Sequence, residues 1–233
     1  MVADTLIYHP TLTKLVTFWD STPKREKSFR LLAYLSRFLA YYAYRKGYSA
    51  ETISLFKDLK SHFTFIRKGL RFFKPINHLQ TAAKTYDNKL LDPVLQATTV
   101  IRNLGYAGYL TLDTVVWFKL LGLIDKKNYP NVGKWASRFW FIGLVAGIVN
   151  SLHIIKSLVH FSEDESNEKI SAENQAAREK KLYTAKRKLV WDLLDAFICL
   201  NTLDVLHFTE GDIGLAGIIT SVMGLKDLWA ATA

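Results

Sequence analysis

LFKDLKSHFTFIRKGLRFFK, residues Leu55 to Lys74, carries the clearest helical periodicity in this sequence. Wound as an α-helix at about 100° per residue, it separates into an apolar face and a basic face. The apolar residues recur at spacings of three and four within one sector: Leu55, Leu59, Phe63, Ile66, Leu70 and Phe73, widened by Phe65 and Phe72. The basic residues occupy the other side: Lys57, Lys60, Arg67, Lys68, Arg71 and Lys74. The pattern predicts a basic amphipathic helix.

A lipid interface would satisfy both faces of this helix at once. Each Lys or Arg near an anionic bilayer contributes about 1 kcal/mol, and each deeply buried Leu, Ile or Phe about 1.5 to 3 kcal/mol. We therefore expect these residues to bind a membrane through anionic phospholipids. Two other interpretations stay open: the apolar face packs on the protein's own core, or it binds a partner protein.

The positive charge of the chain is concentrated in its first part. Over all 233 residues, Lys and Arg number 31 and Asp and Glu 21, a net charge of +10. Residues 1–91 hold 16 basic and 6 acidic residues, and residues 92–233 hold 15 of each. A basic protein can bind nucleic acid, but the sequence has no zinc-finger spacing, RNP-like strand or basic zipper. We expect no nucleic acid as a partner.

Helix is expected almost throughout, because Pro occurs at only five positions and Gly-rich or long β-branched alternating runs are absent. We expect a first helix over Pro10–Asp20, a second from Lys24 to about Arg45, and the basic helix broken at Lys74-Pro75. Another helix begins at about Asn77. The predicted fold class is all-α: a membrane-associated helical bundle with amphipathic helices first and hydrophobic helices last.

Four apolar segments follow in the second half, at about 94–124, 137–161, 188–209 and 213–229. The longest run without a formal charge covers 139–155, 17 residues, near the lower bound for crossing a bilayer. Trp and basic residues flank it, as is typical of a membrane interface. Gly143 and Gly147 form a G-x-x-x-G, which predicts close helix packing in lipid or in a soluble bundle. We expect at least two crossings, with both termini cytosolic.

These features divide the sequence into four segments. Residues 1–91 form a basic amphipathic helical region, and residues 92–161 hold hydrophobic helices embedded in the membrane. Residues 162–187 are expected to form a charged, solvent-exposed loop, in which Ser162 and Ser166 lie among acids. Residues 188–233 are expected to form a hydrophobic helical hairpin. The two serines are either candidate phosphorylation sites or part of an ordinary charged loop.

No motif for catalysis occurs: the sequence lacks a nucleophile elbow, a P-loop, a zinc-protease helix and a dinucleotide-binding loop. Asp204 and His207 lie three apart on a predicted helix, a spacing that favours a local hydrogen bond over a metal site. The lone Cys199 excludes a disulfide framework and is expected to be a small core residue. We therefore expect no catalytic residue, no cofactor and no metal. The protein is expected not to be an enzyme.

Five blocks of the sequence carry a resemblance to a known family. They are DTLIYHPTLTKLVTFWD (Asp4–Asp20), REKSFRLLAYLSRFLA (Arg25–Ala40), IRKGLRFFKPINHLQTAAKTYDNKL (Ile66–Leu90), YTAKRKLVWDLLDAFICLN (Tyr183–Asn201) and the ending TSVMGLKDLWAATA. In the residues of these blocks and in their order, the chain resembles the fungal peroxin-eleven family. Its members are abundant peroxisomal membrane proteins that elongate and divide peroxisomes.

The resemblance implies a mechanism and partners. In the family, an amphipathic helix at the place of Leu55–Lys74 inserts into the cytosolic leaflet, prefers anionic lipid and drives tubulation. Family members self-associate into homo-oligomers and recruit a dynamin-type division machinery. They also carry regulatory serines in the acidic loop, which favours Ser162 or Ser166 as a phosphorylation site. The alternative function is a channel for small metabolites, suggested by pore activity claimed in the family and by charged seams that include Asp195 and Asp204.

Overall fold

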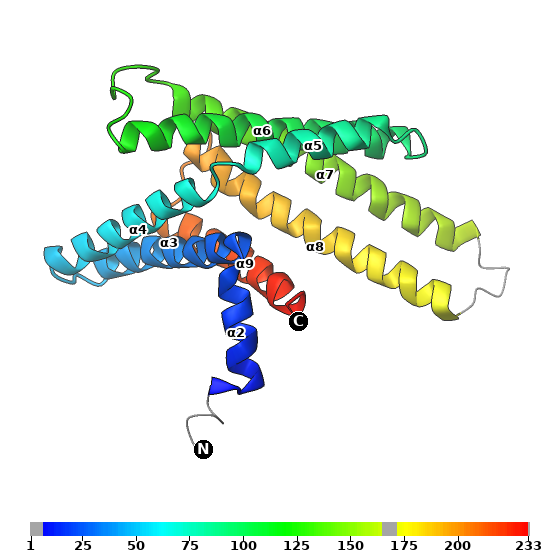
Figure 1. Cartoon of the computed structure of the whole chain (residues 1–233), viewed down its shortest axis with the longest axis horizontal. Coiled ribbons are helices and arrows are strands. Elements are labelled where there is room, and N and C mark those ends of the chain that lie inside the picture. Colours follow the sequence, from blue (N-terminus) through cyan, green and yellow to red (C-terminus); the bar gives the residue numbers. More distant parts are fainter. Residues whose placement is uncertain (1–6, 165–171, 233) are drawn as a thin grey trace. The chain divides into compact units, whose positions relative to one another are not determined.

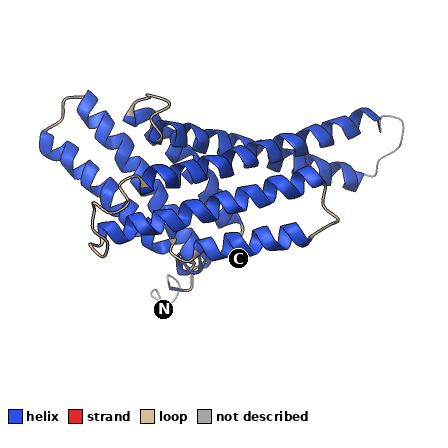
Figure 2. Cartoon of the chain, turned by 90° about the horizontal axis from the view of Figure 1, so that it is seen from above, coloured by secondary structure: helices blue, strands red, loops and turns tan. Residues whose placement is uncertain are grey.

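Helices make up the described structure. The computed structural model describes residues 7–164 and 172–232. Over these residues it contains helices and loops with no strand (Figure 2). The helices follow one another in the order shown in Figure 1: α2 (Pro10–Asp20), α3 (Thr22–Arg45), α4 (Ala50–Leu70), α5 (Lys74–Asp87), α6 (Pro93–Leu120), α7 (Val132–Asp164), α8 (Ala172–Thr202) and α9 (Glu210–Ala230). The predicted all-α fold class is confirmed.

Local signals in the sequence set several helix starts. Pro10 begins α2 and Pro23 lies in the first turn of α3, where a missing backbone N–H costs nothing. The Ser49 hydroxyl accepts a hydrogen bond from the backbone N–H of Thr52 at 3.3 Å and caps α4. Thr209 and Asp212 form a reciprocal capping box at the start of α9. The first two helices expected from the sequence are confirmed almost to the residue.

The end of α4 differs from the expected break at Lys74-Pro75. The helix stops at Leu70, a short turn follows, and α5 begins at Lys74. Pro75 lies in the first turn of α5, so it begins the next helix rather than ending the previous one. The physical reason is that proline suits the first helical turn, which needs no N–H donor there.

Of the charged segment expected as a loop over 162–187, the residues that the structure describes, 162–164 and 172–187, are helical. Helix α8 begins at Ala172, and its exposed first half carries residues such as Glu179, Lys180 and Lys181. Glu, Lys and the neighbouring alanines are strong helix formers. The high charge of this segment therefore does not exclude a helix, as the expectation of a loop had assumed.

The chain forms two compact units that do not follow the four consecutive segments expected from the sequence. The first unit comprises residues 1–72, 117–126 and 207–233, and the second comprises 73–116 and 127–206. The segment expected as a C-terminal hairpin, 188–233, is shared between them. The last helix therefore belongs with the first ones.

In the first unit, α3 packs on both α4 and α9. Small buried residues on α3 allow this close approach: Ala33, Ser36, Ala40 and Ala43. Helix α9 presents glycines to aromatic residues of α3, with Gly211 beside Tyr41, Gly214 beside Phe38 and Gly217 beside Tyr34. A Cβ at Gly214 would lie 2.9 Å from the backbone nitrogen of Phe38. The two helices pack closely because α9 lacks side chains along this line.

In the second unit, α7 packs along α8. Leu144 on α7 and Ala196 and Cys199 on α8 form a buried cluster, against which larger side chains such as Trp140 pack. The Cys199 thiol donates to the backbone oxygen of Ser137 at 3.2 Å. Burial raises the pKa of Cys199 to about 12. The expectation of a small core cysteine is confirmed.

Candidate membrane-binding surface

Helix α4 leaves its apolar residues accessible. Leu55, Ile66 and, just beyond the helix, Phe73 are 56%, 40% and 70% exposed. Leu59, Phe63 and Leu70 are half-buried. The apolar sector predicted from the sequence is therefore open along its length.

Part of this apolar side packs within the first unit. The ring of Phe63 lies 5.9 Å from that of Phe29 on α3. Phe65 and Phe72, which widen the apolar band, lie 6.2 and 6.1 Å from the ring of Trp117. These contacts hold α4 in place while Leu55 and Ile66 stay exposed.

The basic residues of Leu55–Lys74 separate into two groups. Lys57 is exposed, and Lys60, Lys68, Arg71 and Lys74 are partly accessible. Arg67 differs from the expectation of a solvent-facing cation: it is 8% exposed and forms an ion pair with Glu26 of α3 at 3.0 Å. Along Ala50–Leu70, all of which the structure describes, Arg67 is the only buried residue.

The burial of Arg67 has a physical reason that helical periodicity does not contain. Arg67 lies at the border of the two faces, and Glu26 is 41 positions away in the sequence. A buried cation needs a paired and hydrogen-bonded anion. Only the tertiary contact with α3 supplies that anion, so Arg67 is a structural residue in this conformation.

Helix α2 presents an apolar stripe that the sequence analysis did not single out. Its exposed residues recur with helical spacing: Leu12, Leu15, Val16 and Trp19. This i, i+3, i+4, i+7 pattern, applied to Pro10–Asp20, could have identified the stripe. The first unit thus presents two exposed amphipathic elements, α2 and α4.

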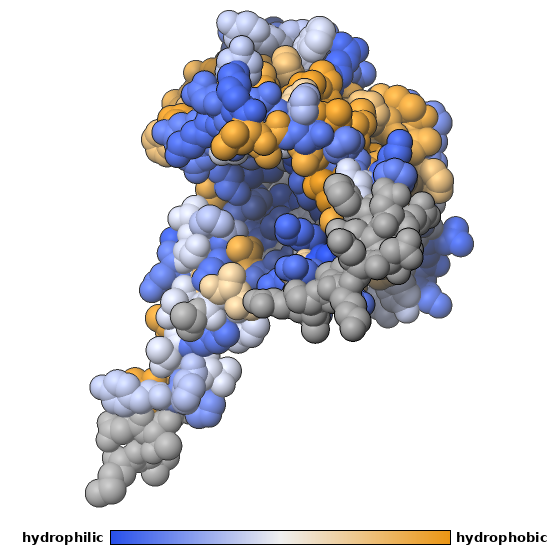
Figure 3. Space-filling model, turned by 90° about the vertical axis from the view of Figure 1, so that its right-hand side faces the viewer, coloured by the Kyte–Doolittle hydropathy of each residue, from blue (hydrophilic) through white to orange (hydrophobic). Residues whose placement is uncertain are grey.

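Two helices of the described residues are long and apolar enough to cross a membrane, Val132–His160 of α7 and Glu210–Ala230 of α9. Only 33% and 39% of their most apolar windows are buried inside the protein. The core helix of a soluble protein would be buried over most of its length. Figure 3 likewise shows apolar residues reaching the surface beside hydrophilic ones.

The two glycines of the G-x-x-x-G lie against α6. A Cβ at Gly143 would come within 3.1 Å of the backbone oxygen of Arg102, and one at Gly105 within 2.7 Å of the backbone nitrogen of Gly143. Gly147 lies beside the Arg102 guanidinium and the Asp192 carboxylate. Both glycines therefore contact neighbours within the second unit.

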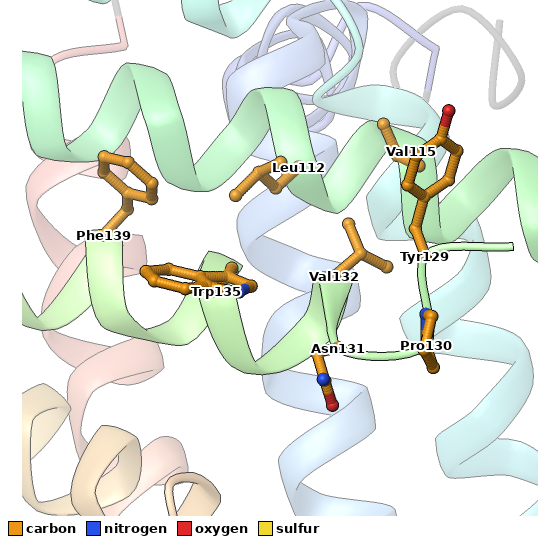
Figure 4. Close-up of a pocket in the computed structure, with 8 residues that line it drawn as sticks. All are labelled: Leu112, Val115, Tyr129, Pro130, Asn131, Val132, Trp135 and Phe139. Carbon is orange, nitrogen blue, oxygen red and sulfur yellow. The ribbon is translucent and has the colours of Figure 1, made fainter.

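An apolar pocket of about 500 Å³ lies at the start of α7. Figure 4 shows Leu112 and Val115 of α6 on one side, and Val132, Trp135 and Phe139 of α7 on the other. Trp135 is half exposed, as expected of an aromatic residue flanking a membrane span. The pocket has no titratable cluster and suggests no chemistry.

The charged seams of the later helices are mostly paired inside the second unit. Arg102 donates from Nη1 and Nη2 to the two carboxylate oxygens of Asp192 at 2.6 and 2.9 Å, and Asp192 is 1% exposed. The indole of Trp191 donates to Asp195 at 3.2 Å. Asp204 is exposed and lies 3.7 Å from Lys134. These contacts explain the charged residues of the later helices by packing within the second unit. The channel alternative stays a prediction.

The structure describes the candidate phosphorylation and metal sites only in part. Ser166 lies outside the described residues, and of Ser162 only the backbone, in the last turns of α7, is described. Within the described residues, no group of three or more His, Cys, Asp or Glu is placed to hold a metal ion.

The fold and this surface define a helical membrane protein with an exposed basic amphipathic helix. The chain belongs to the peroxisomal biogenesis factor 11 (PEX11) family, whose model matches residues 12–229. It is 40% identical to peroxisomal membrane protein PMP30A of Candida boidinii and 39% identical to PMP27 of Saccharomyces cerevisiae. Both matches cover 100% of this chain and at least 99% of the relative. No solved structure matches.

A more distant relative is peroxisomal biogenesis factor 11 of Schizosaccharomyces pombe, 26% identical over 95% of this chain. The family resemblance read from the sequence is thus confirmed, and it extends through the middle of the chain. The protein is a peroxisomal membrane protein of a biogenesis factor family. The expected localisation at the peroxisomal membrane is confirmed.

Proposed function

We propose that this protein elongates peroxisomes and promotes their division by inserting the apolar face of α4 into the cytosolic leaflet. The observation that carries the proposal is the exposure of α4: Leu55 and Ile66 are accessible, whereas Arg67 is buried. An ordinary amphipathic helix of a soluble bundle buries its apolar residues and exposes its cations. A helix that leaves Leu55 and Ile66 exposed and its other apolar residues half-buried is suited to lipid.

The charges of α4 support the same proposal. Lys57, Lys60, Lys68 and Arg71 are accessible to headgroups, each contributing about 1 kcal/mol near an anionic surface. Arg67 remains with Glu26 and fixes α4 on α3. Insertion of the apolar side chains expands one leaflet relative to the other, and the unequal areas favour curvature.

Tubulation of a whole organelle requires many copies, and we propose that the protein self-associates at the membrane. A dynamin-type division machinery is the proposed downstream partner, as the family resemblance implies. Cross-linking in isolated peroxisomes tests self-association: covalent dimers and larger species are expected, and monomers alone would remove this part of the proposal.

The test of insertion uses Leu55→Glu with Ile66→Glu in the full chain. Both residues are exposed, whereas Phe63 contacts Phe29, so a charge at Phe63 would also disturb packing. Losing one inserted side chain costs about 1.5 to 3 kcal/mol, or roughly tenfold to a hundredfold in binding. The variant is expected not to tubulate anionic liposomes, as seen by electron microscopy.

Ser54→Glu is the matched control, compared with Leu55→Glu alone. The two positions are adjacent and exposed, and the same charge is added at the same end of α4. The added charge differs only in direction, because the two side chains project about 100° apart around the helix axis. Equal tubulation by Ser54→Glu and Leu55→Glu would contradict insertion of this face.

A further inference from the structure

A second pocket lies in the first unit, between α3, α4 and the start of α9. Its volume is about 640 Å³, within the range of small-ligand sites. The polar side chains that line it are Arg37, Tyr41, Tyr44, Lys57, Lys60, Ser61, Thr209 and Glu210. Two neighbouring helices and a segment about 150 residues further along the sequence thus supply one cavity that contains charged side chains.

The pocket carries an excess of positive charge. Arg37 donates from Nε and Nη2 to the two carboxylate oxygens of Glu210, both at 2.7 Å. The ammonium of Lys60 lies 3.5 Å from the same carboxylate, and Lys57 has no carboxylate within ion-pair distance among the described residues. Three cations against one anion leave two positive charges unmatched.

This arrangement matches a phosphomonoester. Such a group carries about −1.5 to −2 charges at neutral pH and has three strong acceptor oxygens. Lysine ammonium groups bind phosphate as point charges, and the hydroxyl of Tyr44 can donate to its oxygens, whereas that of Ser61 donates to the backbone oxygen of Lys57 at 2.9 Å. We propose that this pocket binds the phosphomonoester of an anionic lipid headgroup.

The position of the pocket favours a lipid headgroup over a soluble phosphate. Lys57 and Lys60 lie on the basic side of α4, which faces headgroups if α4 lies at the membrane surface. Glu210 is the first residue of the candidate span Glu210–Ala230, and the end of a span also lies at headgroup level. The inference therefore goes beyond the proposed function, since it needs a membrane at this site but not insertion of α4.

Calorimetric titration of the full chain in phosphatidylcholine nanodiscs tests the proposal. The probes are short-chain phosphatidylinositol 4-phosphate, short-chain phosphatidylserine, soluble inositol 1,4-bisphosphate and inorganic phosphate. The phosphoinositide is expected to bind at least tenfold more tightly than phosphatidylserine, which lacks a phosphomonoester, and more tightly than either soluble probe. Tighter binding of a soluble probe would overturn the lipid assignment.

Variants locate the site. Lys57→Gln with Lys60→Gln is expected to weaken phosphoinositide binding at least tenfold. Arg45→Gln with Lys46→Gln removes the same charge from the end of α3, outside the pocket, and is expected to change binding less than twofold. Equal losses in both double variants would show general electrostatic attraction and overturn the pocket.

A third variant guards against loss by misfolding. Glu210→Gln removes the only carboxylate that lines the pocket and frees Arg37, so it is expected to tighten binding at least threefold. Unchanged or weaker binding by this variant would contradict the proposal. Because a small nanodisc cannot form a tubule, this experiment can fail or succeed independently of the tubulation test on Leu55 and Ile66.

Discussion

Arg67 of α4 donates from Nε and Nη2 to one carboxylate oxygen of Glu26 in α3, at 3.1 and 3.0 Å, and both residues are buried. Burial lowers the pKa of Arg67, and the carboxylate of Glu26 opposes that change. The pair fixes the α3–α4 hairpin from which the exposed residues of α4 project. A charge pair inside the hairpin thus sets the geometry of the candidate membrane-binding surface.

Removing one partner of this pair is expected to be costly. Glu26→Gln leaves the guanidinium of Arg67 buried without its counter-charge, which typically costs about 3 to 5 kcal/mol. Thermal unfolding of the detergent-solubilised chain measures the loss. The double variant Glu26→Leu with Arg67→Met should recover most of it, and a near-neutral Glu26→Gln would contradict a structural role for the pair.

Gly147→Ala is expected to destabilise the second unit. A Cβ there would collide with the guanidinium of Arg102 and displace it from Asp192. Such overpacking typically costs about 1 to 3 kcal/mol. Gly133→Ala is the control on the same helix, because a Cβ at Gly133 meets nothing within 4 Å. Equal unfolding temperatures for the two variants would refute the collision.

Gly214→Ala is expected to loosen α9 from α3. Its Cβ would press on the backbone of Phe38, which cannot move aside as a flexible side chain can. We expect a loss of about 1 to 3 kcal/mol, seen as faster hydrogen exchange in α9 with unchanged exchange in α7. Leu215→Ala, on the exposed side of α9, should leave α9 protected. Protection unchanged in Gly214→Ala would speak against close packing here.

His78 on α5 is expected to make the second unit less stable in acid. Burial lowers the pKa of His78, and the positive charges of Lys74 and Arg102 add to the effect against the hydrogen bond with Asn103. The pKa of His78 in the folded chain lies below the ordinary 6.5. Between these two pKa values, His78 is therefore protonated more in the unfolded chain than in the folded chain. Stability therefore falls as the pH drops through 6.5.

Unfolding temperatures measured from pH 8 to pH 5 test this dependence. They are compared between the unsubstituted chain and two histidine variants. His78→Gln should flatten the decrease, whereas His62→Gln, at an exposed position of α4, should leave it unchanged. A slope that persists in His78→Gln would assign the dependence to another group.

Much of the fold could be predicted from local sequence. Pro10 and Pro23 mark the starts of α2 and α3, and the 3.6-residue period identifies α4. The long apolar runs identify α7 and α9 as candidate spans. These features depend on residues within one helix, which is why they can be read from the chain alone.

What could not be predicted depends on contacts between distant segments. The spacing of Arg67 does not reveal Glu26, and the glycines of α9 do not reveal the aromatic residues of α3. The cavity with Arg37 and Glu210 likewise joins positions 173 residues apart. Periodicity shows which face is apolar, but only the partner shows which residues are covered.

The first unit is built from both ends of the chain, since α9 packs on α3. During synthesis the early helices leave the ribosome well before the last one exists, and domains generally fold as units once their segments are available. This unit therefore cannot be completed until α9 has been synthesised. Shortening the C-terminus by one helix would leave the N-terminal hairpin without its partner, so truncations at either end should produce the same defect.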